Sequence, residues 1–167
     1  MFTRRLVLVI VALAGSVGHT SGAQPTLWYD KPNGFTGSST DEVETWIAPG
    51  LDGVIHVYPF RPHQGDARDE FRRTLFKERI GTPYREDRLL IAPTFKTMTV
   101  SGADSALSAS FRNFNGGAPR EHLRVAIVAA GLVALVDISA NSPQAFERNW
   151  PSVSRVLNSL RVVRVGL

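Results

Sequence analysis

The sequence predicts an α+β domain in which helices pack on an antiparallel sheet of about six to seven strands. Two nearly continuous apolar runs, 122–130 and 132–138, flank Gly131 and predict neighbouring strands that are buried on both faces. Two other segments, 66–80 and 142–160, repeat apolar residues with a helical period behind a capping residue. The order along the chain is a strand, a hairpin, a helix, further strands and a closing helix, which favours an antiparallel sheet.

The strands before the first helix are predicted to be short. Residues 27–29 form an extended aromatic segment, and residues 43–47 alternate apolar with polar side chains, the period of a half-buried strand. A turn rich in glycine follows, and residues 54–60 form the next strand. We therefore expect 43–47 and 54–60 to pair as a hairpin, with His56 and Tyr58 on the same face of the second strand.

The first helix is predicted to begin at Asp66, whose side chain can cap the free N–H groups of the first turn. Ala67, Phe71 and Leu75 recur every four residues, and charged residues fill the opposite side. One face of this helix is therefore expected to pack on the sheet. Gly81 ends the helical pattern.

Beyond this helix the chain is expected to return to strands. Residues 89–91, 95–100 and 106–112 are strand-like, and the amide- and glycine-rich segment 113–119 is expected to be a loop. The apolar hairpin that follows contains a carboxylate, Asp137, near its end. We expect Asp137 to lie on the outer face of the sheet or at the seam with a helix.

The closing helix is predicted to start at Ser142, a capping residue, with Pro143 at the first helical position that suits its fixed φ. Pro151 is expected to kink or restart this helix. Because Trp150 has the largest side chain on the apolar face, we expect it to be the largest buried contact with the strands at 125–138. The predicted apolar face consists of Phe146, Trp150, Val153, Val156, Leu157 and Leu160.

Residues 1–23 have the three parts of a secretory signal peptide. Arg4-Arg5 is a positively charged start, and residues 6–14 are an apolar run that is too short to span a membrane. Ser21-Gly22-Ala23 offers the small residues that a signal peptidase requires. We expect cleavage after Ala23 and a secreted or periplasmic protein, with no membrane span after the signal is removed.

The rest of the chain, 24–167, is predicted to be a single α+β domain. The sequence contains no cysteine, which excludes disulfides and thiolate metal sites. The formal net charge of the whole chain is +4, part of which belongs to the signal peptide, and the arginines are scattered. This distribution argues against a nucleic-acid-binding protein.

Sequence motifs for catalysis, cofactors and metals are not found. His56, His63 and His122 lack the spacing of a zinc site, and no serine stands in a GxSxG motif. Gly116-Gly117 is not followed by the lysine of a phosphate loop. We therefore expect no catalytic residue, no metal and no cofactor.

Residues at both ends of the domain follow the pattern of a known family. The opening has an aromatic strand, then Pro32-Asn33-Gly34-Phe35, then a strand with Trp46 at its centre. The ending has a long hairpin, Phe146, Pro151 and the triplet Ser159-Leu160-Arg161. This pattern resembles PsbP-like and Mog-type α/β/α sandwich domains. The resemblance implies the same sandwich fold and a non-enzymatic binding or accessory role, and it implies no particular partner or binding residue.

Binding is expected at two loops, because exposed loops on a rigid sheet commonly carry it. The residues of this predicted rim are Phe60, Arg61, His63, Arg112, Asn113 and Phe114. The sequence thus predicts an exported, non-enzymatic binding or accessory module with a protein partner in the cell envelope. A cofactor-free periplasmic hydrolase is the alternative, and the identity of the ligand and the oligomeric state stay open.

Overall fold

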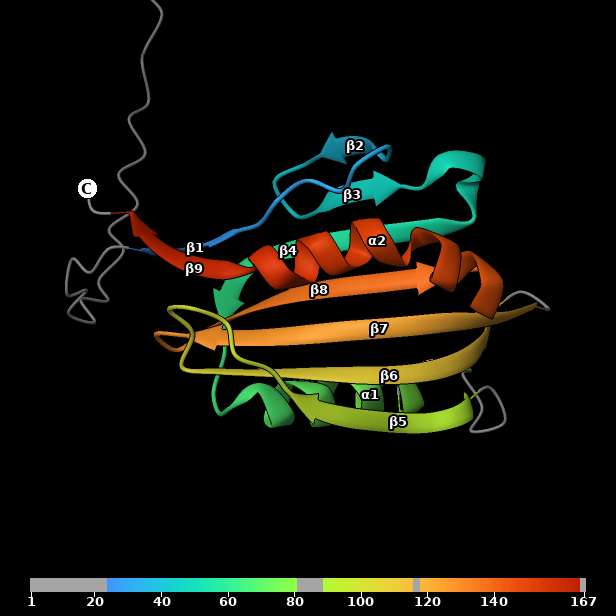
Figure 1. Ribbon diagram of the computed structural model, residues 1–167. Helices are drawn as coiled ribbons and strands as arrows, with labels where there is room; N and C mark the ends of the chain where they lie inside the picture. The colour runs from blue at the N-terminus through green and yellow to red at the C-terminus, as the bar shows by residue number, and fades with distance from the viewer. Residues whose placement is uncertain (1–23, 81–88, 116–117, 166–167) are drawn as a thin grey trace, which may run out of the picture.

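The computed structural model describes residues 24–80, 89–115 and 118–165 (Figure 1). In chain order the elements are β1 (Gln24–Trp28), β2 (Thr36–Ser39), β3 (Glu44–Ile47), the 3-10 turn η1 (Pro49–Leu51), β4 (Gly53–Pro62), α1 (Ala67–Ile80), β5 (Leu89–Thr97), β6 (Ser105–Asn115), β7 (Ala118–Ala129), β8 (Leu132–Ala140), α2 (Pro143–Ser159) and β9 (Arg161–Val165). The expected signal peptide, residues 1–23, lies outside the described residues. The single domain over 24–167 stays a prediction.

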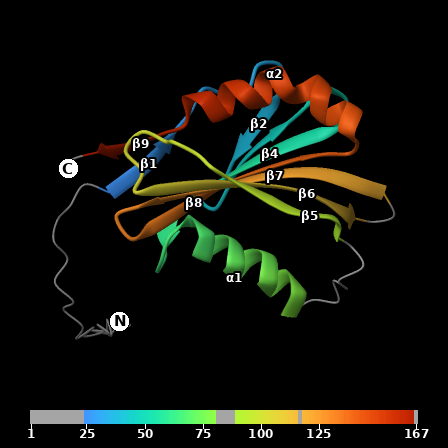
Figure 2. The same cartoon turned by 60° about the horizontal axis from the view of Figure 1, so that its bottom comes forward.

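The main body is an antiparallel sheet of seven strands in the order β2-β3-β4-β8-β7-β6-β5. Helix α2 lies on one side of this sheet and helix α1 on the other (Figure 2). The predicted α+β class, an antiparallel sheet with helices packed on it, is therefore confirmed. The expected hairpin is β3 and β4, which pair from Glu44↔Val57 to Ile47↔Val54.

Strands β7 and β8 are buried on both faces, as their apolar runs predict. Val125 pairs with Val136, and both belong to the core that contains the side chains of α2. The next pair, Ala126 and Leu135, belongs to the core that contains the side chains of α1. Successive residues of the paired segments 125–129 and 132–136 thus serve two different cores, which explains why these segments are continuously apolar.

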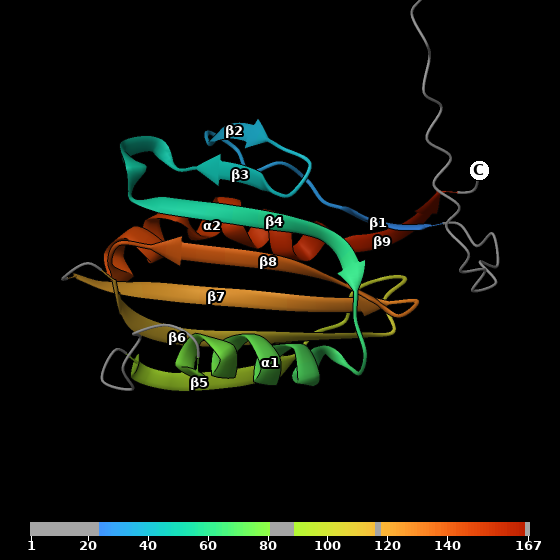
Figure 3. The same ribbon diagram turned by 180° about the vertical axis from the view of Figure 1, so that it is seen from behind.

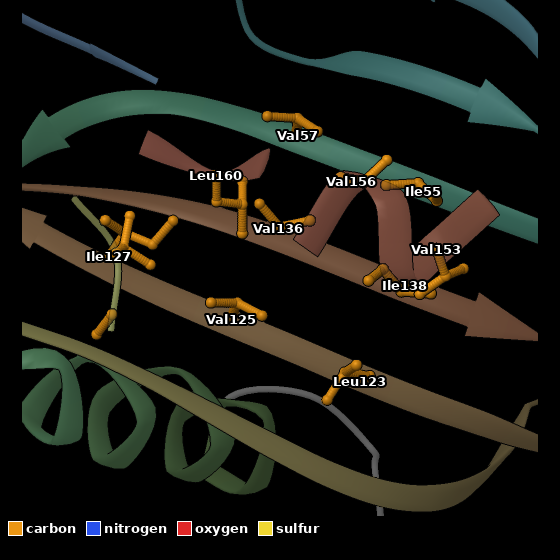
Figure 4. Close-up of a cluster of buried hydrophobic side chains, with 12 residues drawn as sticks. Ile55, Val57, Leu123, Val125, Ile127, Val136, Ile138, Val153, Val156 and Leu160 are labelled. Atoms are coloured by element: carbon orange, nitrogen blue, oxygen red, sulfur yellow. The ribbon is translucent and has the colours of Figure 1, made fainter. Parts of the chain in front are cut away.

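The core on the α2 side contains Val153, Val156 and Leu160, which recur at helical spacing and pack on β4, β7 and β8 (Figure 4). Ser142 caps this helix as predicted, since its Oγ accepts a hydrogen bond of 3.1 Å from the N–H of Ala145. The apolar stripe of α2 therefore closes one face of the sheet.

The expected burial of Trp150 is wrong, because this residue is 43 % exposed. The buried stripe of α2 passes to one side of Trp150, and its ring packs on Phe146 instead, with 5.8 Å between the ring centres. The restart expected at Pro151 is also not seen, because α2 continues through it as one helix. Residue volume alone did not indicate which side of the helix faces the sheet.

Helix α1 begins as predicted. The Oδ1 atom of Asp66 accepts hydrogen bonds of 2.8 and 3.0 Å from two N–H groups of the first turn. Ala67 and Phe71 are buried against the sheet. The side chain of Leu75, and Gly81, lie outside the described residues.

Several strand bounds differ from expectation. Segment 113–119, expected to be a loop, largely extends the hairpin, because β6 reaches Asn115 and β7 starts at Ala118. The segments expected at 89–91 and 95–100 form one strand, β5, whose pairing with β6 shifts register. Strand β2 was not predicted because it is exposed along its whole length and has no apolar alternation. Strand β9 was not predicted either.

The first and last described strands form a separate two-stranded sheet, the terminal clasp (Figure 1). Gln24 pairs with Val165 at one end of this clasp, and Trp28 pairs with Arg161 at the other. The Arg161 guanidinium lies 3.7 Å from the centre of the Trp28 ring, a cation–π contact. The clasp thus holds the two ends of the described chain side by side.

We expect Leu160→Ala to lower the free energy of unfolding by about 2–5 kcal/mol, because it removes a buried side chain between α2 and the sheet. Trp150→Ala should cost clearly less, since the Trp150 side chain is partly in solvent. Denaturant unfolding followed by circular dichroism measures both. Arg155→Ala is the control, because Arg155 is exposed and makes only a 3.5 Å contact with Asp30. Equal losses for Leu160→Ala and Arg155→Ala would contradict the packing of α2.

Candidate functional site

The sheet is only partly covered on its α1 side. Helix α1 packs mainly on β6 and β7, and its Phe71 also contacts Phe95 of β5. Among the described residues no helix lies over β2, β3, β4 and the later part of β8 on this side (Figure 3). We call this part of the sheet the open face. Its side chains are those that alternate with the residues of the α2-side core.

Five residues on five strands form a row that crosses the open face and ends at its border with β7, and we call it the polar row. Direct strand pairing joins its members, Ser38 with Thr45, Thr45 with His56, His56 with Asp137, and Asp137 with Arg124. Side chains in register on neighbouring strands are about 5 Å apart and can contact one another. The row therefore places hydroxyl, imidazole, carboxylate and guanidinium groups side by side on one surface.

Strand alternation explains why these side chains point to the open face. Both neighbours of His56 in β4 belong to the α2-side core, so His56 points to the opposite side. The same holds in β8, where Val136 and Ile138 of that core flank Asp137. This is one of the two positions expected for Asp137, the outer face of the sheet.

Two polar contacts join neighbouring members of the row in pairs. The Thr45 Oγ1 atom lies 3.0 Å from His56 Nδ1, a hydrogen bond between a hydroxyl and an imidazole. The Arg124 guanidinium donates a 2.8 Å hydrogen bond to Asp137 Oδ2. The second carboxylate oxygen, Oδ1, lies 3.8 Å from His122 Nδ1, and neither atom has a hydrogen-bond partner among the described residues.

His122 lies beside the polar row and has a fixed orientation. Its Nε2 atom lies 2.9 Å from Asn113 Oδ1, so that Nε2 carries a hydrogen and donates it to the amide oxygen. Its ring stacks on Phe111, with the planes 2° apart and the centres 4.9 Å apart. The Arg124 guanidinium also lies over Phe111, at 5.7 Å from its centre. Phe111 therefore supports both the His122 ring and the Arg124 guanidinium beside Asp137.

The electrostatics of the row keep Asp137 ionised. Burial alone would raise the pKa of its carboxyl group, whose side chain is only 17 % exposed. The adjacent His122 imidazole and Arg124 guanidinium outweigh burial and lower the pKa of Asp137 from 3.8 to about 2. Burial, together with the charge of Asp137, raises the pKa of Tyr58, so this phenol remains a neutral hydrogen-bond donor. The open face thus offers donors and acceptors in a fixed, half-buried arrangement.

The structure separates the residues of the predicted rim. Phe60 borders a cleft at the edge of the sheet. Arg112 forms an ion pair with Glu121, its direct strand partner, on the α2 side of the sheet. Asn113 alone reaches the neighbourhood of the polar row, through His122. The side chain of Phe114 lies outside the described residues.

Arg61 and His63 belong to a different cluster, around a fully buried carboxylate. Glu70 of α1 is 0 % exposed and forms ion pairs with Arg61 and Arg73, while His63 Nδ1 lies 3.2 Å from its Oε2. The Nε2 atom of His63 lies 3.0 Å from the carbonyl oxygen of Asp66. A buried carboxylate has to be paired in this way. The cluster fixes the connection between β4 and α1, which gives Arg61 and His63 a structural task.

Within the described ranges, no group of three or more His, Cys, Asp or Glu side chains could hold a metal ion. The helices of the same ranges include none that is long and apolar enough to cross a membrane.

Comparison with known proteins gives the class of fold. No protein-family model and no curated protein matches the chain. The structure of LpqN from Mycobacterium tuberculosis, described as involved in cell envelope biogenesis, matches with a TM-score of 0.59 at 12 % identity over 87 % of each chain. Cyanobacterial PsbP (CyanoP) from Synechocystis sp. PCC 6803 matches with a TM-score of 0.54 at 16 % identity, over 89 % of this chain and 98 % of that one. The chain therefore has a PsbP-like α+β fold, and at these identities the likeness shows the fold alone.

Asp137 should make the stability of the protein depend on acid pH. Its pKa is lowered by folding, so its contribution is complete above pH 3.8 and is lost as the pH falls towards about 2. The shift corresponds to about 2 kcal/mol. We expect Asp137→Asn to be less stable than the parent by about this amount at neutral pH, and the difference to shrink near pH 2. Denaturant unfolding at pH 7, 5 and 2 measures it; a difference that does not change with pH would contradict the ionised contact.

Proposed function

We propose that this chain is an exported binding or accessory module that contacts its partner through the open face of the sheet. The observation that carries the proposal is the polar row, in which polar groups from five strands lie in register and Ser38, Thr45 and His56 lie on the part of the sheet that α1 leaves uncovered. Export is supported by the signal-like start of the sequence. A structural neighbour described as involved in cell envelope biogenesis agrees with a role in that compartment.

The chemistry of the open face favours a protein partner in the cell envelope. The row presents both a carboxylate and a guanidinium, already paired with each other, so it does not favour a strongly charged ligand of either sign. Ile47 of β3 is 37 % exposed and lies two residues from Thr45, on the same face of the strand. Apolar contacts surrounded by specific hydrogen-bonding groups are typical of protein interfaces.

A photo-crosslinking side chain at position 47 tests this proposal in the exporting cell. We expect Ile47→p-benzoylphenylalanine to give one defined adduct with an envelope protein, because the open face contacts it. p-Benzoylphenylalanine at position 147, on the exposed side of α2, is the matched control and should give no adduct. Adding His56→Ala to the crosslinking variant should weaken the adduct without lowering the melting temperature strongly. Equal labelling from positions 47 and 147, or no adduct from position 47, would contradict the proposal.

A cofactor-free hydrolase is the second candidate, and one contact favours it. A hydroxyl nucleophile needs a neighbouring base, and the Thr45 hydroxyl lies 3.0 Å from an imidazole nitrogen of His56. In such a reaction His56 would accept the Thr45 proton while Oγ1 adds to the carbonyl carbon. Collapse of the adduct would break the bond to the leaving alcohol or amine, which takes up that proton, and water would then hydrolyse the acyl group from Thr45. His63 is less suited to this role, because both its ring nitrogens contact protein groups.

A screen of ester, peptide and glycan substrates separates the two candidates. If the binding proposal holds, the purified protein should show no turnover in this screen. Turnover that falls at least about a hundredfold in Thr45→Ala and in His56→Ala, but not in Glu147→Gln, would establish the hydrolase instead. Loss of structure is controlled by comparing the circular dichroism spectra of all three variants.

A further inference from the structure

A second site lies away from the polar row, at the edge of the sheet. A cleft of about 240 Å³ opens between β1, the turn from β2 to β3, and the later part of β4. It exists because β3 pairs with β4 only up to Val57, so that among the described strands none is hydrogen-bonded to the following residues of β4 on that edge. The cleft is smaller than the usual pocket for a drug-sized ligand, and its size suits a single long side chain.

The lining of the cleft selects for positive charge. It contains two carboxylates, Asp41 and Glu44, and no lysine, arginine or histidine. Neither carboxylate has an ion-pair partner among the described residues. Carboxylates without a cation of their own, in a concave and partly apolar setting, attract a cationic group and repel an anionic one.

Glu44 is held in a fixed position by two aromatic side chains. Its Oε2 atom accepts a hydrogen bond from the Tyr29 hydroxyl, which in turn accepts one of 2.9 Å from Trp46 Nε1. Burial, reinforced by the hydrogen bond to Glu44, raises the pKa of Tyr29, so its hydroxyl remains a donor at all ordinary pH values. The Oε1 atom of Glu44 has no hydrogen-bond partner among the described residues. One carboxylate oxygen is therefore oriented by the protein while the other can accept from a ligand.

Aromatic and apolar side chains complete the cleft. Tyr29, Tyr58 and Phe60 line it, together with Leu27 and Val43. Aromatic rings attract ammonium and guanidinium groups through their faces, and apolar walls accommodate the methylene chain of a lysine or arginine. Acidic, aromatic and aliphatic groups thus meet in the combination that a long basic side chain requires.

The edge of β4 adds a reason to expect a peptide. An extended segment can lie along an unpaired strand edge and present alternate side chains to it. Pro59 lies in this part of the edge and has no N–H to donate, so backbone pairing alone supplies little affinity. The basic side chain has to supply most of the specificity.

We propose that this cleft binds a lysine or arginine side chain presented by an extended segment of a partner protein. The cleft contains none of the five residues of the polar row, so it goes beyond the proposed function and does not depend on it. It gives the chain a second contact, selective for a basic segment, at the edge of the same sheet.

The probe is the capped pentapeptide acetyl-Gly-Val-Lys-Val-Gly-amide. It is titrated into the isotope-labelled protein, and binding is followed by two-dimensional NMR. We expect shifts of the amide signals of Thr26, Thr40 and Glu44, and weaker binding as the salt concentration rises. The matched peptide with norleucine in place of lysine should bind roughly five- to tenfold more weakly, because it keeps the methylene chain and loses the charge. Equal binding of the two peptides, or shifts spread over the whole sheet, would overturn the proposal.

Protein variants and a free amine complete the test. Asp41→Asn, an exposed substitution, should weaken binding of the lysine peptide roughly fivefold, and Glu147→Gln on α2 should leave it unchanged. Glu44→Gln should weaken it as well, if its spectrum remains that of the folded protein. Equal affinity for 1,5-diaminopentane would show that the cleft takes a free amine and would overturn the peptide assignment. Asp41→Asn should not change crosslinking from position 47, which separates this proposal from the proposed function.

Discussion

The need to bury both faces of β7 and β8 determines the architecture of this protein. Each strand presents apolar side chains in both directions, so one covering layer is not enough. Helix α2 satisfies this need on one side with Val153, Val156 and Leu160. Helix α1 satisfies it on the other side with Ala67 and Phe71, but only over part of the sheet. The uncovered remainder has to carry polar side chains, and the polar row is the result.

A buried charge fixes the position of helix α1 on the sheet. Among its described side chains Ala67 and Phe71 belong to the core, and the buried Glu70 cluster fixes its first turns to the end of β4 through Arg61 and His63. A charged group in the interior costs free energy unless it is fully paired, so it permits only one arrangement of its partners. This restriction fixes where α1 starts relative to the end of β4.

Most of the fold could be predicted from local pattern, whereas the candidate site could not. Apolar period and capping residues identify the central hairpin and both helices, because burial and capping act on neighbours in sequence. The polar row depends on the register of five strands, which the sequence of a single strand does not reveal. The polar residues His56 and Asp137 within apolar strands were the indication of a site that the sequence did contain. Arg61 and His63 resembled a binding loop because their partner, Glu70, lies on the next helix. Trp150 was misplaced because helical period does not indicate which edge of a broad apolar face meets the sheet.

The terminal clasp determines how this protein would respond to a pulling force. Its strands are antiparallel and its outer pair is Gln24 with Val165, so tension on the two ends would act across the strands rather than along them. Hydrogen bonds loaded in this way break one pair at a time, so the two strands separate at a low force. The opening would run inward until it met Trp28 and Arg161, whose ring and guanidinium lie against each other. The sheet behind this contact would remain unloaded until the clasp had separated.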